Sequence, residues 1–222
     1  MFNMKFLIGS IALSIVFGIS NLSYAQYIDH EIWYGGVIRY DINKQLRVDL
    51  EEQFRSNLTA GILRQNFTEL GMSYKFNRYF RVRGFFRYTN RYADYGKYRL
   101  GLDARARYSK KGNPIALSYR IRLQQTKEIF TKEPESIFRQ QFKMEYNLSK
   151  LVDPSFGFEL FHRFNGYNNI QGLRYTIGLD WRLYKGLELA TFLRFDQEKN
   201  VSDPVLKVIY GFSLVYDLKL KD

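Results

Sequence analysis

The sequence contains no cysteine, only four prolines and two histidines, and its one long hydrophobic run lies at the N-terminus. The lack of cysteine excludes a small domain held together by disulfides, and two histidines are too few for a typical transition-metal site. No glycine-rich phosphate loop is present either, so we expect neither a metal nor a cofactor. The 222 residues are 45% hydrophobic and 18% aromatic, which excludes a disordered or collagen-like chain.

The N-terminal run has the features of a secretory signal peptide. A short basic start precedes residues 6–19, which are almost all apolar, and Ser23 and Ala25 are small residues where a signal peptidase reads the chain. The run of about 14 residues is shorter than the roughly 20 that a membrane-spanning helix needs. We therefore predict a signal peptide at residues 1–25 and one domain at residues 26–222, exported to a bacterial envelope.

The rest of the chain alternates between hydrophobic and polar residues, which predicts β-strands with two chemically different faces. The clearest alternating segments are residues 46–55, 80–88, 98–108, 115–124 and 173–183. The intervening polar positions are mostly charged, and arginine is the commonest of them. The weakest predicted strand is 136–146, whose hydrophobic residues would also suit one face of a helix.

Alternation alone does not say which face points inward, because a soluble barrel buries its hydrophobic face and a membrane barrel turns that face to lipid. Three features favour the membrane barrel. The strands are about 9 to 13 residues long, short turns alternate with longer loops, and aromatic residues gather at strand ends on the hydrophobic face. These aromatic residues are Tyr40, Tyr74, Phe76, Tyr88, Tyr92, Tyr108, Tyr146, Trp181 and Tyr216. We predict an all-β transmembrane, antiparallel up-and-down barrel in the bacterial outer membrane, with a soluble periplasmic or secreted β-barrel binding protein as an alternative.

The number of strands depends on the structure of residues 27–34. Eleven strands can be recognised, whereas bacterial single-chain barrels have even numbers. A short extra strand at residues 27–34, turning at Gly35 and Gly36, would give twelve. We favour twelve strands over ten.

Four short segments carry a resemblance to a known family. They are Trp33, the charged stretch 49–55, the stretch 70–76 and the arginine-containing stretch 85–88. Residues 31–218 resemble an uncharacterised family of outer-membrane barrel proteins, the domain of unknown function 2490 family. The resemblance implies a barrel fold and no particular activity.

The last predicted strand suggests two partners. Gly211, Leu214 and Tyr216 have the spacing of the C-terminal insertion signal of outer-membrane barrels. The match is imperfect, because Ile209 stands where that signal prefers a polar residue. We expect the barrel assembly machinery and outer-membrane lipids to be partners of the chain.

The polar face of the predicted barrel is rich in arginine. Ten arginines are predicted to line the lumen, namely Arg81, Arg83, Arg87, Arg99, Arg105, Arg107, Arg120, Arg122, Arg174 and Arg182. Six more share their face: Arg47, Arg55, Arg91, Arg139, Arg163 and Arg194. Because arginines outnumber the acids on this face, the lumen could admit small anionic solutes. The alternative is a plugged structural barrel in which opposed charges fill the interior as ion pairs. Nucleic-acid binding is not expected, because most aromatic residues lie on the opposite face from the arginines.

Catalysis has few candidate residues. His30 follows the predicted cleavage site in a segment that we expect to be flexible. The segment starting at His162 resembles the H-x-S-N-G motif of outer-membrane phospholipases, but Phe164 occupies the position of the nucleophilic serine. We therefore predict a protein without enzymatic activity, and keep a phospholipase-like enzyme using His162 as the alternative.

Overall fold

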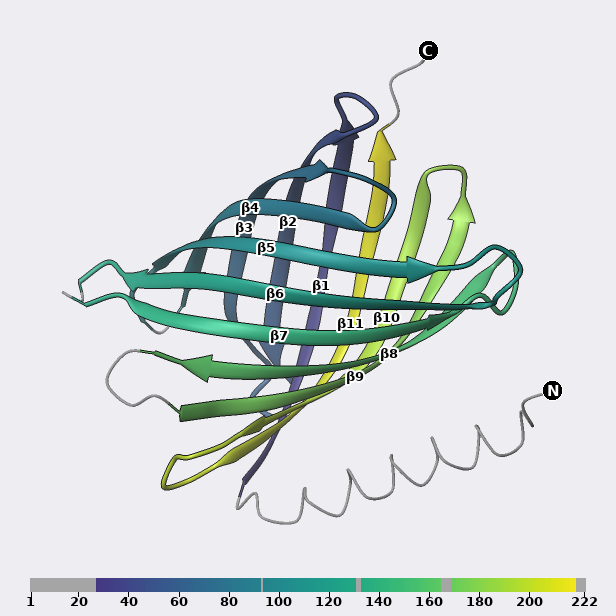
Figure 1. The fold of residues 1–222 in the computed structure, drawn as a ribbon. Coiled ribbons are helices and arrows are strands. Elements are labelled where there is room, and N and C mark those ends of the chain that lie inside the picture. The colour runs from purple at the N-terminus through teal and green to yellow at the C-terminus, as the bar shows by residue number, and fades with distance from the viewer. Residues whose placement is uncertain (1–26, 93, 131–132, 165–168, 219–222) are drawn as a thin grey trace.

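The computed structural model describes residues 27–92, 94–130, 133–164 and 169–218, which form a closed β-barrel (Figure 1). Its strands are β1 (Tyr27–Asp41), β2 (Leu46–Asn57), β3 (Ile62–Lys75), β4 (Phe80–Arg91), β5 (Lys97–Ser109), β6 (Ile115–Glu128), β7 (Glu135–Tyr146), β8 (Val152–Arg163), β9 (Asn169–Tyr184), β10 (Leu187–Glu198) and β11 (Val205–Leu218). The predicted all-β barrel is confirmed, and the weakest predicted strand, 136–146, is β7.

The burial pattern is the reverse of that in a soluble protein. Among the described residues only eight hydrophobic side chains are buried, whereas forty-five large hydrophobic side chains are exposed. Fifteen polar or charged side chains are buried instead. A water-soluble barrel would bury its hydrophobic face, so this molecule turns its hydrophobic face outward and its charged face inward. All nine aromatic residues expected at the strand ends are among the exposed side chains.

The connections differ at the two ends of the barrel. One end carries turns of two to five residues at 42–45, 76–79, 110–114, 147–151 and 185–186, whereas the six-residue connections between β6 and β7 and between β10 and β11 lie at the other end. We call these the short-turn end and the long-loop end. Gly112 and Gly186 have φ angles of 82° and 80° in two of the short turns, a backbone conformation that glycine adopts without strain.

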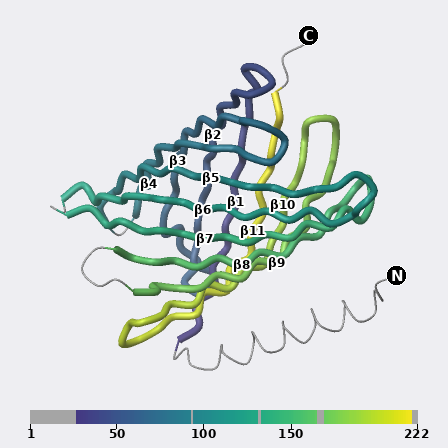
Figure 2. The backbone as a smooth tube through the Cα atoms, in the orientation of Figure 1, coloured from purple at the N-terminus to yellow at the C-terminus, as the bar shows by residue number. Residues whose placement is uncertain are grey.

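The barrel closes between its first and last strands, which lie side by side and run parallel (Figure 1; Figure 2). Their pairing extends from Tyr27 opposite Val205 to Tyr40 opposite Leu218. All other neighbouring strands are antiparallel. A parallel closure is what an odd number of consecutive strands requires, because the first and last strands then point the same way.

The barrel therefore has eleven strands, one fewer than the twelve that the sequence favoured. Residues 27–34 do not form a separate strand, because the chain stays extended through Gly35 and Gly36 and pairs with β2 on one side and β11 on the other. A Cβ atom on Gly35 would lie 2.1 Å from the backbone oxygen of Glu52. Glycine is thus needed here for the close approach of β1 to β2 rather than for a turn.

Two expectations concern the N-terminal part of the chain. The predicted signal peptide at residues 1–25 lies outside the described residues. His30, expected in a flexible segment, is instead held in β1, where its ring stacks with that of Tyr210 at 6.2 Å. Among the described residues, no helix is long and hydrophobic enough to span a bilayer.

Candidate functional site: the arginine-rich lumen

The barrel encloses an interior space of about 1060 Å³. Its lining reaches from Asn147, just beyond β7 at the short-turn end, to Gln171 and Lys207 near the long-loop end. Seventeen basic side chains and nine acidic side chains line this space, a surplus of eight positive charges. The inward face of the barrel is therefore strongly cationic along its length.

All ten arginines that were expected in the lumen line this space. Seven of them form ion pairs with acidic side chains: Arg83, Arg87, Arg107, Arg120, Arg122, Arg174 and Arg182. The remaining three, Arg81, Arg99 and Arg105, have no acidic side chain within 4 Å in the part of the chain that the structure describes. This division separates arginines that are ion-paired within the barrel from arginines that are not.

A belt of buried ion pairs crosses the middle of the lumen. Asp103 on β5 accepts hydrogen bonds of 2.5 and 2.7 Å from Nε and Nη2 of Arg122 on β6. Glu69 on β3 accepts from Arg83 at 2.8 Å and from Nε of Arg87 at 2.7 Å. Such bidentate contacts fix the side chains across strands and satisfy charges that would be costly to bury alone.

Glu159 on β8 is the most highly connected acid of this belt. It is 2% exposed and accepts from Arg139 Nε and Nη2 at 3.1 and 2.9 Å and from Arg120 Nη2 at 2.8 Å. Arg174 Nη1 lies 3.6 Å away and also binds Asp196. One carboxylate therefore neutralises arginines from strands β6, β7 and β9.

Unpaired arginines lie on the short-turn side of this belt. Arg81 on β4 is directly opposite Arg105 on β5, and Arg105 is directly opposite Arg120 on β6. Like charges in directly opposed cross-strand positions repel each other and destabilise a sheet. Arg39, Arg47 and Arg107 add further repulsion at Arg81. The positive charges of Arg81 and Arg105 therefore neutralise no acidic side chain within 4 Å among the described residues.

A second group of unpaired arginines surrounds Trp33 on the long-loop side of the belt. The guanidinium of Arg55 stacks on the indole at 3.7 Å from the ring centroid, and that of Arg194 lies 5.1 Å from it. The ring is 5% exposed and its Nε1 donates to Glu31 at 2.6 Å. Neither arginine has an acidic side chain within 4 Å among the described residues, whereas nearby Arg174 is paired with Asp196.

Inward-facing aromatic side chains were not anticipated from the sequence. Besides Trp33, arginines stack on Phe67, Phe85, Phe161 and Phe192 in the lumen. Two of these rings lie over glycines of a neighbouring strand: a Cβ on Gly101 would be 2.2 Å from Phe85 Cζ, and one on Gly211 would be 2.0 Å from Phe192 Cζ. The sequence offered a signal for two of them, in Phe85 next to Phe86 and in Phe161 between Leu160 and His162, because neighbouring residues of a strand face opposite ways.

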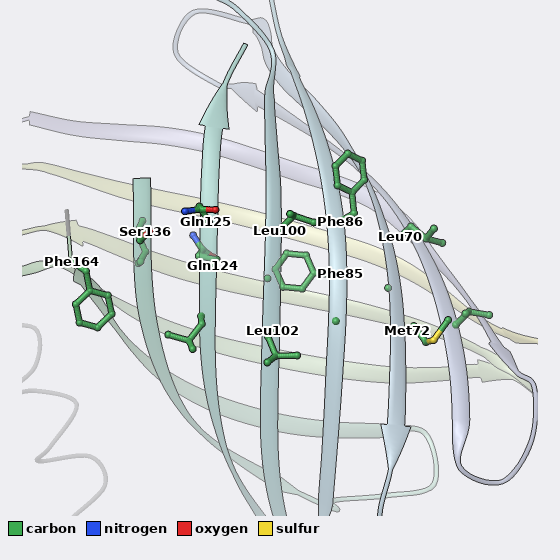
Figure 3. A pocket seen from close by; sticks show the side chains of 16 residues that line it. Leu70, Met72, Phe85, Phe86, Leu100, Leu102, Gln124, Gln125, Ser136 and Phe164 are labelled. Carbon is green, nitrogen blue, oxygen red and sulfur yellow. The ribbon is translucent and has the colours of Figure 1, made fainter. Parts of the chain in front are cut away.

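The outer face carries an apolar groove of about 800 Å³ that extends from Val48 on β2 across β3 to β6 and reaches Ser136 on β7 (Figure 3). Leu70, Met72, Leu100 and Leu102 flank it, and Gly84 leaves open space between them. A hydrophobic groove of this kind suits a lipid chain when the outer face is in contact with a bilayer.

One end of this groove is lined by Ser136 and Phe164, close to the histidine that was considered for catalysis (Figure 3). His162 lies on the outer face of β8 and contacts the Phe164 ring at 5.3 Å. It pairs with Phe138 of β7, which places Ser136 in the diagonal position on the same face. Diagonal neighbours are separated by about 7–8 Å. Ser136 of β7 thus lies near His162. In the H-x-S-N-G motif the serine would instead stand two residues after the histidine, at the position of Phe164.

No metal site is apparent in the barrel. Among the described residues there is no group of three or more histidine, cysteine, aspartate or glutamate side chains that could hold an ion. Six of the nine acids that line the interior are instead ion-paired with arginines.

Solved porin structures are similar to this barrel at low sequence identity. The NanC porin matches with a TM-score of 0.51 and 10% identity, over 77% of this chain and 87% of that chain. The KdgM porin matches with a TM-score of 0.46 and 15% identity, over 76% and 89% of the two chains. The KdgM porin in complex with disordered oligogalacturonate matches with a TM-score of 0.46 and 17% identity, over 79% and 90%.

No protein with curated annotation is significantly similar to the chain in sequence. A family model, in contrast, covers most of the barrel. The model described as Protein of unknown function (DUF2490) matches residues 30–205. The chain therefore belongs to the DUF2490 family, as the resemblance in its sequence indicated.

Proposed function

We propose that this protein is an outer-membrane barrel that passes small anionic solutes through its lumen and has no catalytic role. The observation that carries the proposal is the interior space of about 1060 Å³ with seventeen basic and nine acidic side chains along it. Positive side chains in a confined path attract anions and exclude cations, because the surrounding protein concentrates their field.

The pairing pattern supports conduction over a plugged structural barrel. A barrel whose interior charges serve only to fill space would be expected to pair them, because an unpaired buried charge is costly. Here five arginines that line the interior space have no acid within 4 Å among the described residues: Arg55, Arg81, Arg99, Arg105 and Arg194. Their charge is consistent with a hydrated path that small anions enter.

The outer face supports the proposed location. Its exposed hydrophobic residues would contact outer-membrane lipids, and its aromatic residues would lie at the two interfaces of the bilayer. At the C-terminal end, Leu214 and Tyr216 are 45% exposed on the outer face of β11. These residues are accessible to the barrel assembly machinery, which we propose as the second partner.

The proposal is tested by ion flux into lipid vesicles. We expect vesicles containing the refolded chain without residues 1–25 to take up chloride faster than potassium when each is measured with an entrapped dye. Insertion is checked on a gel, where the folded barrel should run faster before boiling than after. Uptake of potassium at the same rate or faster would contradict anion passage, and a monomer that stays soluble without detergent would contradict the membrane location.

A second candidate function is hydrolysis of lipid esters at the outer groove, favoured by the placement of Ser136 diagonal to His162. If this function is correct, the barrel should release fatty acid from phospholipid in mixed micelles, and His162→Ala and Ser136→Ala should each abolish the release. Met144→Ala, on the same outer face of β7, is the control variant. Absence of release from the unaltered barrel would reject this candidate.

A further inference from the structure

Three of the unpaired arginines are positioned in the same manner. In each, Nε donates to a neutral side chain: Arg55 to Gln53 at 2.9 Å, Arg99 to Thr126 at 2.9 Å and Arg194 to Thr176 at 3.2 Å. The forked end of each guanidinium has no acidic partner within 4 Å among the described residues. A fork that is oriented through Nε and left unneutralised is suited to bind carboxylate or phosphate oxygens.

These arginines are gathered on the long-loop side of the ion-pair belt. Arg55 and Arg194 both stack on Trp33, and Arg55 is close enough to Arg99 and Arg194 for their charges to repel it. Phe67 supports Arg55 from a second side at 5.0 Å. The aromatic rings therefore hold like charges together without supplying the negative charge that would neutralise them.

The acids nearest to this group are largely engaged elsewhere. Asp196 binds Arg174 through both of its oxygens. Glu31 accepts from Trp33 and Arg64. Glu51 also faces the lumen and lowers the local surplus of charge, since it attracts both Arg55 and Arg87. Arg55, Arg99 and Arg194 nevertheless keep guanidinium forks that no acidic side chain of the described residues approaches within 4 Å, while Glu69 and Glu135 attract Arg99, and Asp196 and Glu159 attract Arg194, from farther away.

We infer that Arg55, Arg99 and Arg194 form a binding site for oxyanions that carry two or more negative charges. The inference rests on the proposed function and deepens it, because it places a saturable step within the anion path. Guanidiniums from β2, β5 and β10 can bind separate oxygens of one multivalent solute, whereas chloride offers a single centre. The site recognises carboxylate and phosphate groups alike.

The site can be tested by calorimetric titration of the folded barrel in detergent at constant ionic strength. Pyrophosphate and citrate serve as the phosphate and carboxylate probes, and chloride is the monovalent comparison. We expect saturable binding of at least one of the two multivalent probes and none of chloride. Arg55→Gln and Arg194→Gln should each weaken binding by roughly tenfold or more, because each removes a charge-assisted contact.

Arg107→Gln is the matched control, because it removes one lumen charge at the short-turn end, where Glu145 keeps Lys143 as a partner at 2.9 Å. It should leave binding unchanged. Arg99→Gln tests the site without altering the rings around Trp33, and so serves if the other variants fail to fold. Equal weakening by Arg107→Gln, or the absence of saturable binding, would overturn the inference.

Tryptophan fluorescence tests the location of the site independently of calorimetry. The chain has two tryptophans, and Trp181 is on the outer face, so Trp181→Phe leaves Trp33 as the only tryptophan. Its emission should shift at the same probe concentrations that saturate the calorimetric signal. If the barrel binds the probes but does not conduct ions, the proposed channel function is wrong and the inferred binding site stands. If the barrel conducts anions selectively but shows no saturable binding, the inferred binding site is wrong and the proposed channel function stands.

Discussion

Replacing Glu159 by glutamine is expected to destabilise the barrel more than any other single substitution of an interior acid. Glu159 is 2% exposed and neutralises Arg120 and Arg139, with Arg174 also nearby. Its loss leaves Arg120 and Arg139 without an acidic partner, and removing one member of a buried ion pair costs about 3–5 kcal/mol. The free energy of unfolding should fall by this amount in urea titrations of the barrel in lipid vesicles.

Glu145→Gln provides the control for this prediction. Glu145 also has two basic partners, Arg107 at 2.7 Å and Lys143 at 2.9 Å, but it lies at the short-turn end and these partners are more exposed. More exposed ion pairs contribute about 0–1 kcal/mol. Equal losses of stability in the two variants would show that the central belt does not hold the barrel together.

Reversing Arg81 and Arg105 together to glutamate is expected to abolish the anion preference. The two arginines lie directly opposite each other and have no acidic partner within 4 Å among the described residues, so their reversal leaves no acid without a counterion. At about 4 Å a unit charge contributes roughly 1 kcal/mol even in water, and about 1.4 kcal/mol corresponds to a tenfold change. The ratio of chloride to potassium permeability should fall by roughly tenfold or more.

Two variants separate this effect from general changes in charge. Reversal of Lys110 and Lys111 changes the charge equally in an exposed turn outside the lumen, and it should leave the permeability ratio nearly unchanged. Arg83→Glu would place a third acid beside Asp49 and Glu69, and we expect that variant to fail to fold. An unchanged ratio after reversal of Arg81 and Arg105 would mean that ions do not pass this row.

The sequence was sufficient to predict the barrel and its inverted burial, because alternation has a period of two and leaves each strand only one inward face. It could not predict how the barrel closes. Gly35 and Gly36 suggest a turn when they are considered locally, and only the pairing of β1 with both neighbours shows that the chain stays extended there. Closure is a long-range property that no local pattern encodes.

The sequence also predicted which arginines face the lumen, but not which of them would be paired. Arg83 and Arg81 are two residues apart on the same face, yet Arg83 binds Asp49 and Glu69 and Arg81 binds no acid among the described residues. The difference arises from cross-strand register with β3. Arg81 lies opposite Lys75, whereas the guanidinium of Arg83 lies over Gly71, which is opposite Asp49 and two residues from Glu69. Trp33 was visible in the sequence only as a feature of the family, whereas the structure shows that arginines from β2 and β10 stack around it.

The most direct test of the account is the reversal potential of single barrels in a planar lipid bilayer under a gradient of potassium chloride. The lining of the lumen carries a surplus of eight positive charges. Single barrels should therefore give discrete conductance steps whose reversal potential is shifted toward the equilibrium potential of chloride. A reversal potential shifted toward the equilibrium potential of potassium, or a demonstrably inserted barrel that conducts no ions, would contradict the account.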